Sequence, residues 1–167
     1  MKKILLVTDD AYTYSGRERI FSLMNSIYAK DNEVTIVSLS GSGKTHYNFE
    51  GYKSFITLEG CNLKLYNLLK IIKDGGFDFV FLVSMGKLTT FFSIYIPLIR
   101  SSKTGMIACE HVSLESLGIV KGFLKRKALK LYHKVVVLTE RDRVNLSTDK
   151  INDVVVIRYY RVPNNNN

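Results

Sequence analysis

The chain has 167 residues, of which 46% are hydrophobic, with 24 lysines and arginines against 15 aspartates and glutamates. This length and apolar content predict one domain with a sizeable core, and exclude intrinsic disorder before the last few residues. The net charge of +9 favours an anionic partner. Charge alone leaves open whether that partner is lipid, nucleic acid or a phosphorylated substrate.

Cys61 and Cys109 have no paired spacing, and the first residues lack a signal-peptide pattern, so we expect reduced thiols in a cytoplasmic protein. The apolar strand pattern around Cys109 favours a place in the core. The longest apolar stretch, residues 88–99, is interrupted by polar residues and Pro97 and is too short to span a bilayer. We therefore expect no transmembrane segment.

The N-terminal segment has the pattern strand, helix, strand. Residues 2–8 form an apolar run with a basic start, which is typical of a parallel strand buried on both faces. Ser15-Gly16-Arg17-Glu18 has the pattern of a capping box, in which the Ser15 hydroxyl accepts from the Glu18 N–H and the Glu18 carboxylate reaches back. A helix should therefore begin near Gly16. Its apolar stripe towards the sheet is expected to contain Ile20, Leu23, Met24 and Ile27.

The rest of the chain alternates in the same way. Strands are predicted at residues 33–39, 52–58, 77–83, 105–109, 134–138 and 154–157. Helices are predicted at residues 62–73, 88–100, 120–131 and 140–146, with Gly75-Gly76 ending the first and Pro97 ending or kinking the second. The alternation predicts an α/β fold, a Rossmann-like doubly wound, mostly parallel sheet of about six or seven strands with helices on both faces.

The predicted helix start also suggests an anion site. Gly16 has no side chain to keep a ligand from the backbone, and the free N–H groups of a helix start favour negative charge. A phosphate or a sugar hydroxyl could then lie over Ser15 and Gly16. The alternative is that Gly16 only serves a tight turn, and the residues alone leave both interpretations open.

Two other motifs resemble phosphate sites without their context. Gly41-Ser42-Gly43-Lys44-Thr45 resembles the end of a P-loop, but Ser38 stands where a glycine is needed and residues 46–51 lack a helical pattern. Asp9-Asp10 follows the first strand as in a phosphorylation receiver domain, but no aspartate ends the third strand. We therefore expect a surface loop at 41–45, and loop carboxylates at 9–10 that hold the glycine turn.

Five segments occur in a recognisable order: residues 14–19 after the first strand, Glu110-His111 after the fifth, residues 135–140, residues 154–157, and Val162-Pro163-Asn164. Together they resemble the N-terminal half of a bacterial family-four glycosyltransferase, and the likeness covers nearly the whole chain. Two departures from the family pattern are Ser15 in place of the first glycine of the turn, and the longer crossover at residues 158–161.

The resemblance implies a two-lobed GT-B enzyme that retains the anomeric configuration. It would move a hexose from a nucleotide-sugar donor to a polysaccharide or lipid-linked acceptor in cell-surface glycan synthesis, without a metal or other cofactor. Residues 1–163 would be the N-terminal, acceptor-side domain, and residues 164–167 an asparagine tail. The C-terminal donor-binding domain would be absent, so the chain alone should be inactive.

His111 matches the family histidine that contacts the donor sugar near the reacting carbon, so the resemblance assigns it a catalytic role in orienting the sugar and stabilising charge. A place at the carboxyl end of a strand agrees with a ligand site, although a lone histidine is more often structural. The other expected substrate-binding residues are Ser15, Gly16, Arg17 and Glu110. Glu110 either orients His111 or faces solvent.

Residues 121–134 are predicted to include a basic amphipathic helix. Its apolar stripe is expected to contain Val120, Phe123, Leu124, Ala128 and Leu131. The cations around the rest are Lys121, Lys125, Arg126, Lys127 and Lys130. One interpretation is a helix that covers the sheet and turns a solvated face outward. The other is peripheral docking on an anionic inner leaflet, where each basic residue contributes on the order of 1 kcal/mol. Nucleic acid is disfavoured because no aromatic platform accompanies the cations.

Three functions are open at this stage: half of a glycosyltransferase, a stand-alone Rossmann-like module that binds a nucleotide or sugar, and an interaction protein recruited to membranes. The first needs a second domain, the second needs nucleotide binding by this chain alone, and the third needs binding to anionic vesicles without a sugar nucleotide.

Overall fold

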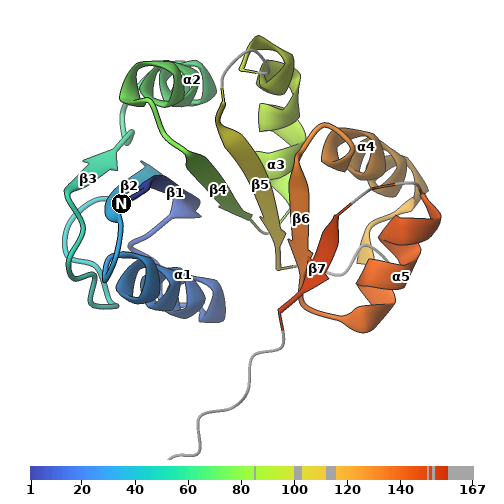
Figure 1. The fold of residues 1–167 in the computed structure, drawn as a ribbon, viewed down its shortest axis with the longest axis horizontal. Coiled ribbons are helices and arrows are strands. Elements are labelled where there is room, and N and C mark those ends of the chain that lie inside the picture. The colour runs from blue at the N-terminus through green and yellow to red at the C-terminus, as the bar shows by residue number, and fades with distance from the viewer. Residues whose placement is uncertain (85, 100–102, 112–115, 150, 152, 158–167) are drawn as a thin grey trace, which may run out of the picture.

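The structure is a computed structural model that describes residues 1–84, 86–99, 103–111, 116–149, 151 and 153–157. Within these ranges, one parallel sheet has the strand order β3-β2-β1-β4-β5-β6-β7 (Figure 1). The strands are β1 (Lys3–Asp10), β2 (Glu33–Ser40), β3 (Ser54–Thr57), β4 (Phe79–Ser84), β5 (Gly105–Glu110), β6 (Lys134–Val137) and β7 (Val154–Val156). The predicted Rossmann-like α/β fold is confirmed, and the architecture is consistent with one lobe of a GT-B fold.

Helices lie between the strands as predicted. They are α1 (Gly16–Tyr28), α2 (Lys64–Gly75), α3 (Lys87–Phe92), the 3-10 helix η1 (Ser93–Leu98), α4 (Ile119–Leu129) and α5 (Glu140–Thr148). Gly76 ends α2 in the left-handed conformation, with a φ of 59°. Pro97 lies inside η1, where the helix predicted at 88–100 has lost its α geometry.

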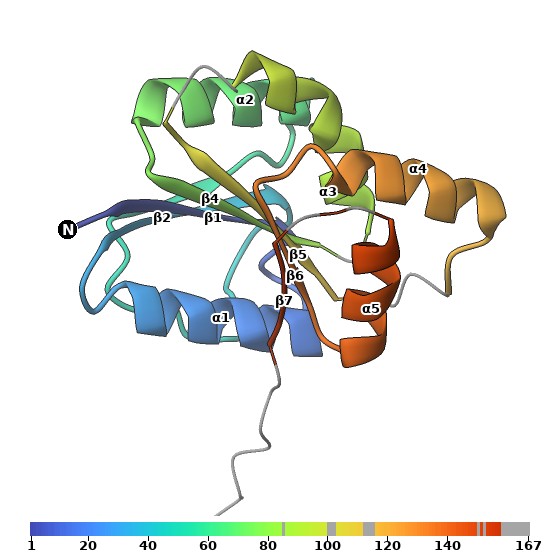
Figure 2. The same cartoon turned by 45° about the vertical axis from the view of Figure 1, so that its right-hand side comes forward.

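Helix α1 lies on one side of the sheet, and α2, α3 and α4 lie on the other (Figure 2). Apolar side chains pack against both faces of the sheet. Phe21 of α1 is fully buried against one face, and Phe92 of α3 against the other. Both faces can be covered because the central strands are apolar on both sides. Cys109 is buried in β5 as a free thiol, which confirms its predicted place in the core.

The buried face of α1 differs from the prediction. Leu23 and Ile27, expected against the sheet, are 52% and 54% exposed. The buried residues of the helix are Glu18, Phe21 and Asn25. Asn25 can face inward because its side-chain Nδ2 donates to the carbonyl oxygen of Glu50 at 2.8 Å, which satisfies the buried N–H side of the amide. The buried face of α1 is therefore rotated about the helix axis relative to the apolar stripe that polarity alone predicts.

The loop predicted at residues 41–45 is confirmed. These residues follow β2 and belong to an irregular connection to β3, so the helix that a P-loop requires does not follow them. Asp9 and Asp10, by contrast, belong to β1 and not to a loop. Asp10 still holds the turn after the strand, because its Oδ1 accepts from the Tyr12 N–H at 2.8 Å.

Candidate functional site

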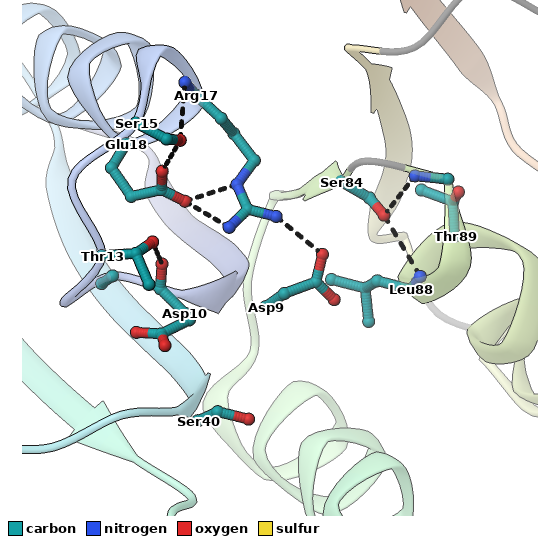
Figure 3. A network of polar contacts seen from close by, with 12 residues as sticks. Asp9, Asp10, Thr13, Ser15, Arg17, Glu18, Ser40, Ser84, Leu88 and Thr89 are labelled. Carbon is teal, nitrogen blue, oxygen red and sulfur yellow. Dashed lines mark hydrogen bonds and ion pairs between the residues drawn. The ribbon is translucent and has the colours of Figure 1, made fainter.

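The order in which successive strands are added to the sheet reverses between β1 and β4. β1 pairs with β2 on one side and with β4 on the other, and all three are parallel. The connection through α1 therefore leads one way and the later connection through α2 leads the other way. Parallel sheets bind ligands outside the carboxyl ends of the strands at such a topological switch point. Asp9, the start of α1 and the turn after β4 meet here (Figure 3).

Ser15 caps α1 at this point. Its backbone is extended, with a φ of −146°, and its Oγ accepts from the Arg17 N–H at 3.3 Å. The hydroxyl also donates to the Glu18 carboxylate. The predicted capping box is thus modified, because the N–H that bonds to the Ser15 hydroxyl belongs to Arg17 and not to Glu18.

Gly16 is the first residue of α1 and is exposed. Its φ lies outside the positive range that only glycine adopts readily, so its backbone does not require a glycine. A Cβ at this position would meet no atom within 4 Å. The space over the helix start is therefore open.

Arg17 is held between two carboxylates (Figure 3). Its Nη1 lies 3.0 Å from Asp9 Oδ2, and its Nε and Nη2 contact Glu18 Oε1. The Arg17 side chain is 12% exposed, and that of Glu18 is fully buried. The guanidinium is therefore fixed in place, with its charge balanced by its neighbours.

His111 directly follows β5. Its backbone N–H donates to the carbonyl oxygen of Ser84 at 3.2 Å, which extends the pairing of β4 and β5 to the carboxyl edge. Burial lowers the pKa of His111 below 6.5, and the positive charge of Arg17 lowers it further, against a smaller opposite effect of Glu18. The lowered pKa favours the neutral imidazole, which can donate one hydrogen bond and accept another.

One of the two alternatives predicted for Glu110, that it faces solvent, is wrong. Glu110 is 4% exposed, and its Oε1 lies 2.7 Å from Nζ of Lys125. Lys125 is itself 1% exposed, so its predicted role in docking on a membrane is wrong. The inward face of α4 consists of Gly122, Lys125, Ala128 and Leu129. Lys125 was assigned outward because of its charge, although its spacing from Gly122 and Leu129 places all three on one side of a helix.

The apolar stripe predicted to cover the sheet from α4 mostly faces outward. The exposed fractions are 72% for Val120, 56% for Phe123, 53% for Leu124 and 41% for Leu131, and Ile119, which precedes the predicted stripe, is 93% exposed. Of the stripe as predicted, Ala128 alone is buried. Lys121, Lys127 and Lys130 are also exposed. We call these eight residues the α4 surface.

Part of this surface lines a groove of about 500 Å³. Its lining residues are Leu117, Ile119, Gly122, Phe123, Arg126, Lys127, Lys130 and Asp149. Arg126 is paired with Asp149, with 3.2 Å between the closest charged atoms, so its charge is partly neutralised. Lys127 lies over the ring of Phe123, 4.5 Å from its centroid. Cations and apolar side chains thus share one side of α4.

Three further findings concern membrane spans, metal ligands and the residues outside the described ranges. In the part of the chain that the structure describes, no helix has the length and apolar character to cross a membrane. Among the same residues, no three His, Cys, Asp or Glu side chains are placed to hold a metal ion. The crossover at 158–161, the motif at 162–164 and the predicted domain end lie outside the described residues.

Sequence reasoning missed two polar residues of this region. Asp9 was considered only as a carboxylate that holds a turn, and Thr89 was not singled out. Thr89 is fully buried, and its hydroxyl donates to Glu110 Oε1 at 2.6 Å. The one available signal was the position of Asp9 at the end of an apolar strand, where side chains of a parallel sheet reach the ligand edge.

No protein-family model matches the chain. The chain is 32% identical over 152 residues to the amylovoran biosynthesis glycosyltransferase AmsD of Erwinia amylovora. The alignment covers 89% of this chain and 42% of AmsD, so the chain spans less than half the length of this relative. The match agrees with the glycosyltransferase resemblance of the motifs. Along most of its length, the chain is thus similar to part of a glycosyltransferase of polysaccharide biosynthesis.

Proposed function

We propose that the chain is part of a glycosyltransferase that moves a sugar from a nucleotide-sugar donor to a glycan or lipid-linked acceptor in cell-surface polysaccharide synthesis. The observation that carries the proposal is the similarity to AmsD over 89% of the chain. The parallel sheet is the architecture that such a lobe requires. Membership of family four, retention of configuration, a hexose donor and the absence of a metal requirement are finer parts of the same proposal, and they rest on the motif resemblance.

The chemistry assigns different tasks to the two sides of the switch point. Glycosyl transfer develops positive charge on the sugar ring and negative charge on the leaving diphosphate. The backbone N–H groups at Ser15 and Gly16 suit the negative charge, because they start a helix whose dipole favours anions. The neutral imidazole of His111 suits a sugar hydroxyl, and a hydrogen bond there would orient the ring for reaction.

A turnover assay of the full-length protein tests the proposal. Uridine and guanosine diphosphate sugars are supplied in turn, and the released nucleoside diphosphate is measured. His111→Ala should lower the rate by about 100-fold or more, because transition-state contacts are lost, while the thermal midpoint stays near that of wild type. His46→Ala, in an exposed position, is the control and should keep the rate. No turnover with any donor, or equal loss of rate and stability in His111→Ala, would contradict the proposal.

The stand-alone module is distinguished by the chain itself. The motif resemblance places nucleotide recognition and the diphosphate clamp in a second lobe, which leaves the Gly16 turn and His111 as contacts in this chain. Residues 1–167 alone should therefore bind sugar nucleotides with a Kd of about 1 mM or weaker. Titration calorimetry with the same donor panel measures this directly. Micromolar binding, or turnover by this chain alone, would favour a module that works by itself.

We also propose that the α4 surface docks on the anionic cytoplasmic leaflet of a membrane, which would make the protein peripheral on the inner face. The supporting observation is that five apolar side chains, each at least 41% exposed, lie beside three exposed lysines. The transfer of apolar groups from water into the headgroup boundary is favourable, and lysines are attracted to anionic lipid. The proposal now excludes Lys125, which is buried, and gives a lesser role to Arg126, which is paired with Asp149.

A further inference from the structure

An enclosed ion pair joins α4 to the end of β5. Nζ of Lys125 lies 2.7 Å from Glu110 Oε1, and it donates to the carbonyl oxygen of Gly86 at 2.9 Å and to the hydroxyl of Thr89. The Thr89 hydroxyl donates to Glu110 Oε1, and the Tyr132 hydroxyl donates to the Thr89 carbonyl oxygen at 2.7 Å. Both charged side chains are 2% exposed. The three N–H donors of the ammonium group therefore have three acceptors.

These contacts lie at the carboxyl ends of β4 and β5, directly beside His111. Glu110 pairs with Ser84 across β5 and β4, and the next residue, His111, donates its N–H to the Ser84 carbonyl oxygen. Ser84 Oγ in turn accepts from the Gly86 N–H at 3.0 Å. Lys125 binds both Glu110 and Gly86, so one side chain of α4 holds the ends of both strands.

Net stability is a poor explanation for this pair. Burial raises the pKa of Glu110 and lowers that of Lys125, and the charge of each partner offsets only part of the effect. Desolvation therefore opposes the charged state of both groups. Replacing a buried ion pair by apolar side chains of similar volume is often neutral or stabilising. A role in setting local geometry accounts better for a lysine at this position.

We propose that Glu110 and Lys125 are positioning residues that fix the place of His111 at the carboxyl edge of the sheet and tie it to α4. The functional meaning rests on the role proposed for His111 in sugar transfer. The positioning itself does not depend on that role. Because α4 carries the buried Lys125 as well as most of the exposed α4 surface, the pair also connects the proposed docking helix to the candidate site.

The test is an NMR titration of the His111 imidazole in residues 1–167. Glu110→Leu with Lys125→Met replaces the pair by apolar side chains of similar size. We expect a denaturation midpoint near that of wild type, and a His111 pKa that rises towards its ordinary value because the ring loses its fixed, half-buried place. The charge of Arg17 lowers the pKa of His111 and that of Glu18 raises it, and neither residue is altered in the double variant.

Two further variants keep the test decisive. Lys125→Arg retains the charge and should leave the His111 titration as in wild type. If the double variant does not fold, Thr89→Val replaces it, because this change removes only the hydroxyl that bridges Lys125 and Glu110. A His111 titration that stays unchanged in the folded double variant, or in Thr89→Val if the double variant fails to fold, overturns the proposal.

An activity measurement separates this proposal from the proposed function. In the full-length protein, the double variant should lower kcat by about 100-fold with little change in KM, as expected when a reacting group is misplaced. A changed His111 titration in a protein without any transferase activity would remove the proposed function and leave the positioning role intact. Normal kcat together with a changed titration would show that His111 is positioned but not needed for transfer.

Discussion

The guanidinium of Arg17 lies 3.0 Å from the carboxylate of Asp9, and this contact ties the first turn of α1 to the end of β1. The same guanidinium contacts Glu18, whose side chain is fully buried. Arg17 thus balances two carboxylates beside the helix start that the proposed function assigns to an anionic ligand. Arg17 therefore contributes both to the orientation of α1 and to the local charge.

Removing the Arg17 charge should be strongly destabilising. Arg17→Met leaves Glu18 buried without its cation, and we expect a loss of about 3 kcal/mol in the free energy of unfolding, measured with urea. Adding Glu18→Gln should recover part of that loss because the uncompensated charge is gone. Arg126→Met is the matched control, and it should cost under about 1 kcal/mol because its ion pair with Asp149 is partly exposed. Equal losses for the two arginines would contradict this assignment.

The pKa of His111 predicts a dependence of stability on pH. Because this pKa is lowered in the folded state, the unfolded chain binds the proton more readily. The stability due to His111 is present above pH 6.5 and is lost as the pH falls through the lowered value. Wild type should therefore lose stability more steeply below pH 6.5 than His111→Gln, as measured by urea unfolding at a series of pH values. Glu110 has a raised pKa and the opposite slope, but it is present in both proteins. Parallel curves would contradict the prediction.

Gly16→Ala should separate ligand approach from folding. A Cβ there meets no atom, and alanine favours helix, so stability should stay constant or rise by up to about 1 kcal/mol. If a ligand approaches the start of α1, the methyl group should lower turnover of the full-length protein by about tenfold, a loss of about 1.4 kcal/mol in binding. Unchanged turnover would place the ligand elsewhere.

The glycine control is Gly41→Ala, which should affect folding directly. Gly41 has a φ of 85°, and a Cβ would lie 2.3 Å from Asp10 Oδ1. Backbone strain and the clash together should lower the free energy of unfolding by about 2 kcal/mol, measured in the same urea experiment. A tolerated Gly41→Ala would mean that the turn after β2 can rearrange.

If the α4 surface docks on membranes, replacing its lysines should weaken binding to anionic vesicles. Replacing Lys121, Lys127 and Lys130 by glutamine should weaken binding to vesicles that contain phosphatidylglycerol by about 3 kcal/mol, or about 100-fold, and should reduce the salt dependence. The measurement is cosedimentation at low and high salt. Glutamine at Lys30, Lys44 and Lys73, which are exposed in other parts of the chain, removes the same charge and should have little effect. An equal loss in both triple variants, or no wild-type binding at low salt, would contradict docking.

Much of the fold could be predicted because its signals are local. The strands are apolar on both faces, and that composition is visible in the sequence without any knowledge of neighbours. Ser15 and Gly76 have the chemistry of helix ends, so the limits of α1 and α2 could be predicted closely. The order of the motifs also indicated a glycosyltransferase resemblance, which the similarity to AmsD supports.

The sequence by itself thus determined the alternation of strands and helices, the parallel sheet and the placement of His111 after a strand. Only the tertiary structure decided which face of α1 and α4 is buried. Lys125 faces inward because Glu110 is its partner, and Asn25 because Glu50 supplies a carbonyl oxygen. A charged or polar side chain can be buried where such a partner satisfies it, and these partners are distant in the chain. Helical periodicity assigns each side chain a face by its own polarity, whereas burial is decided by what lies opposite.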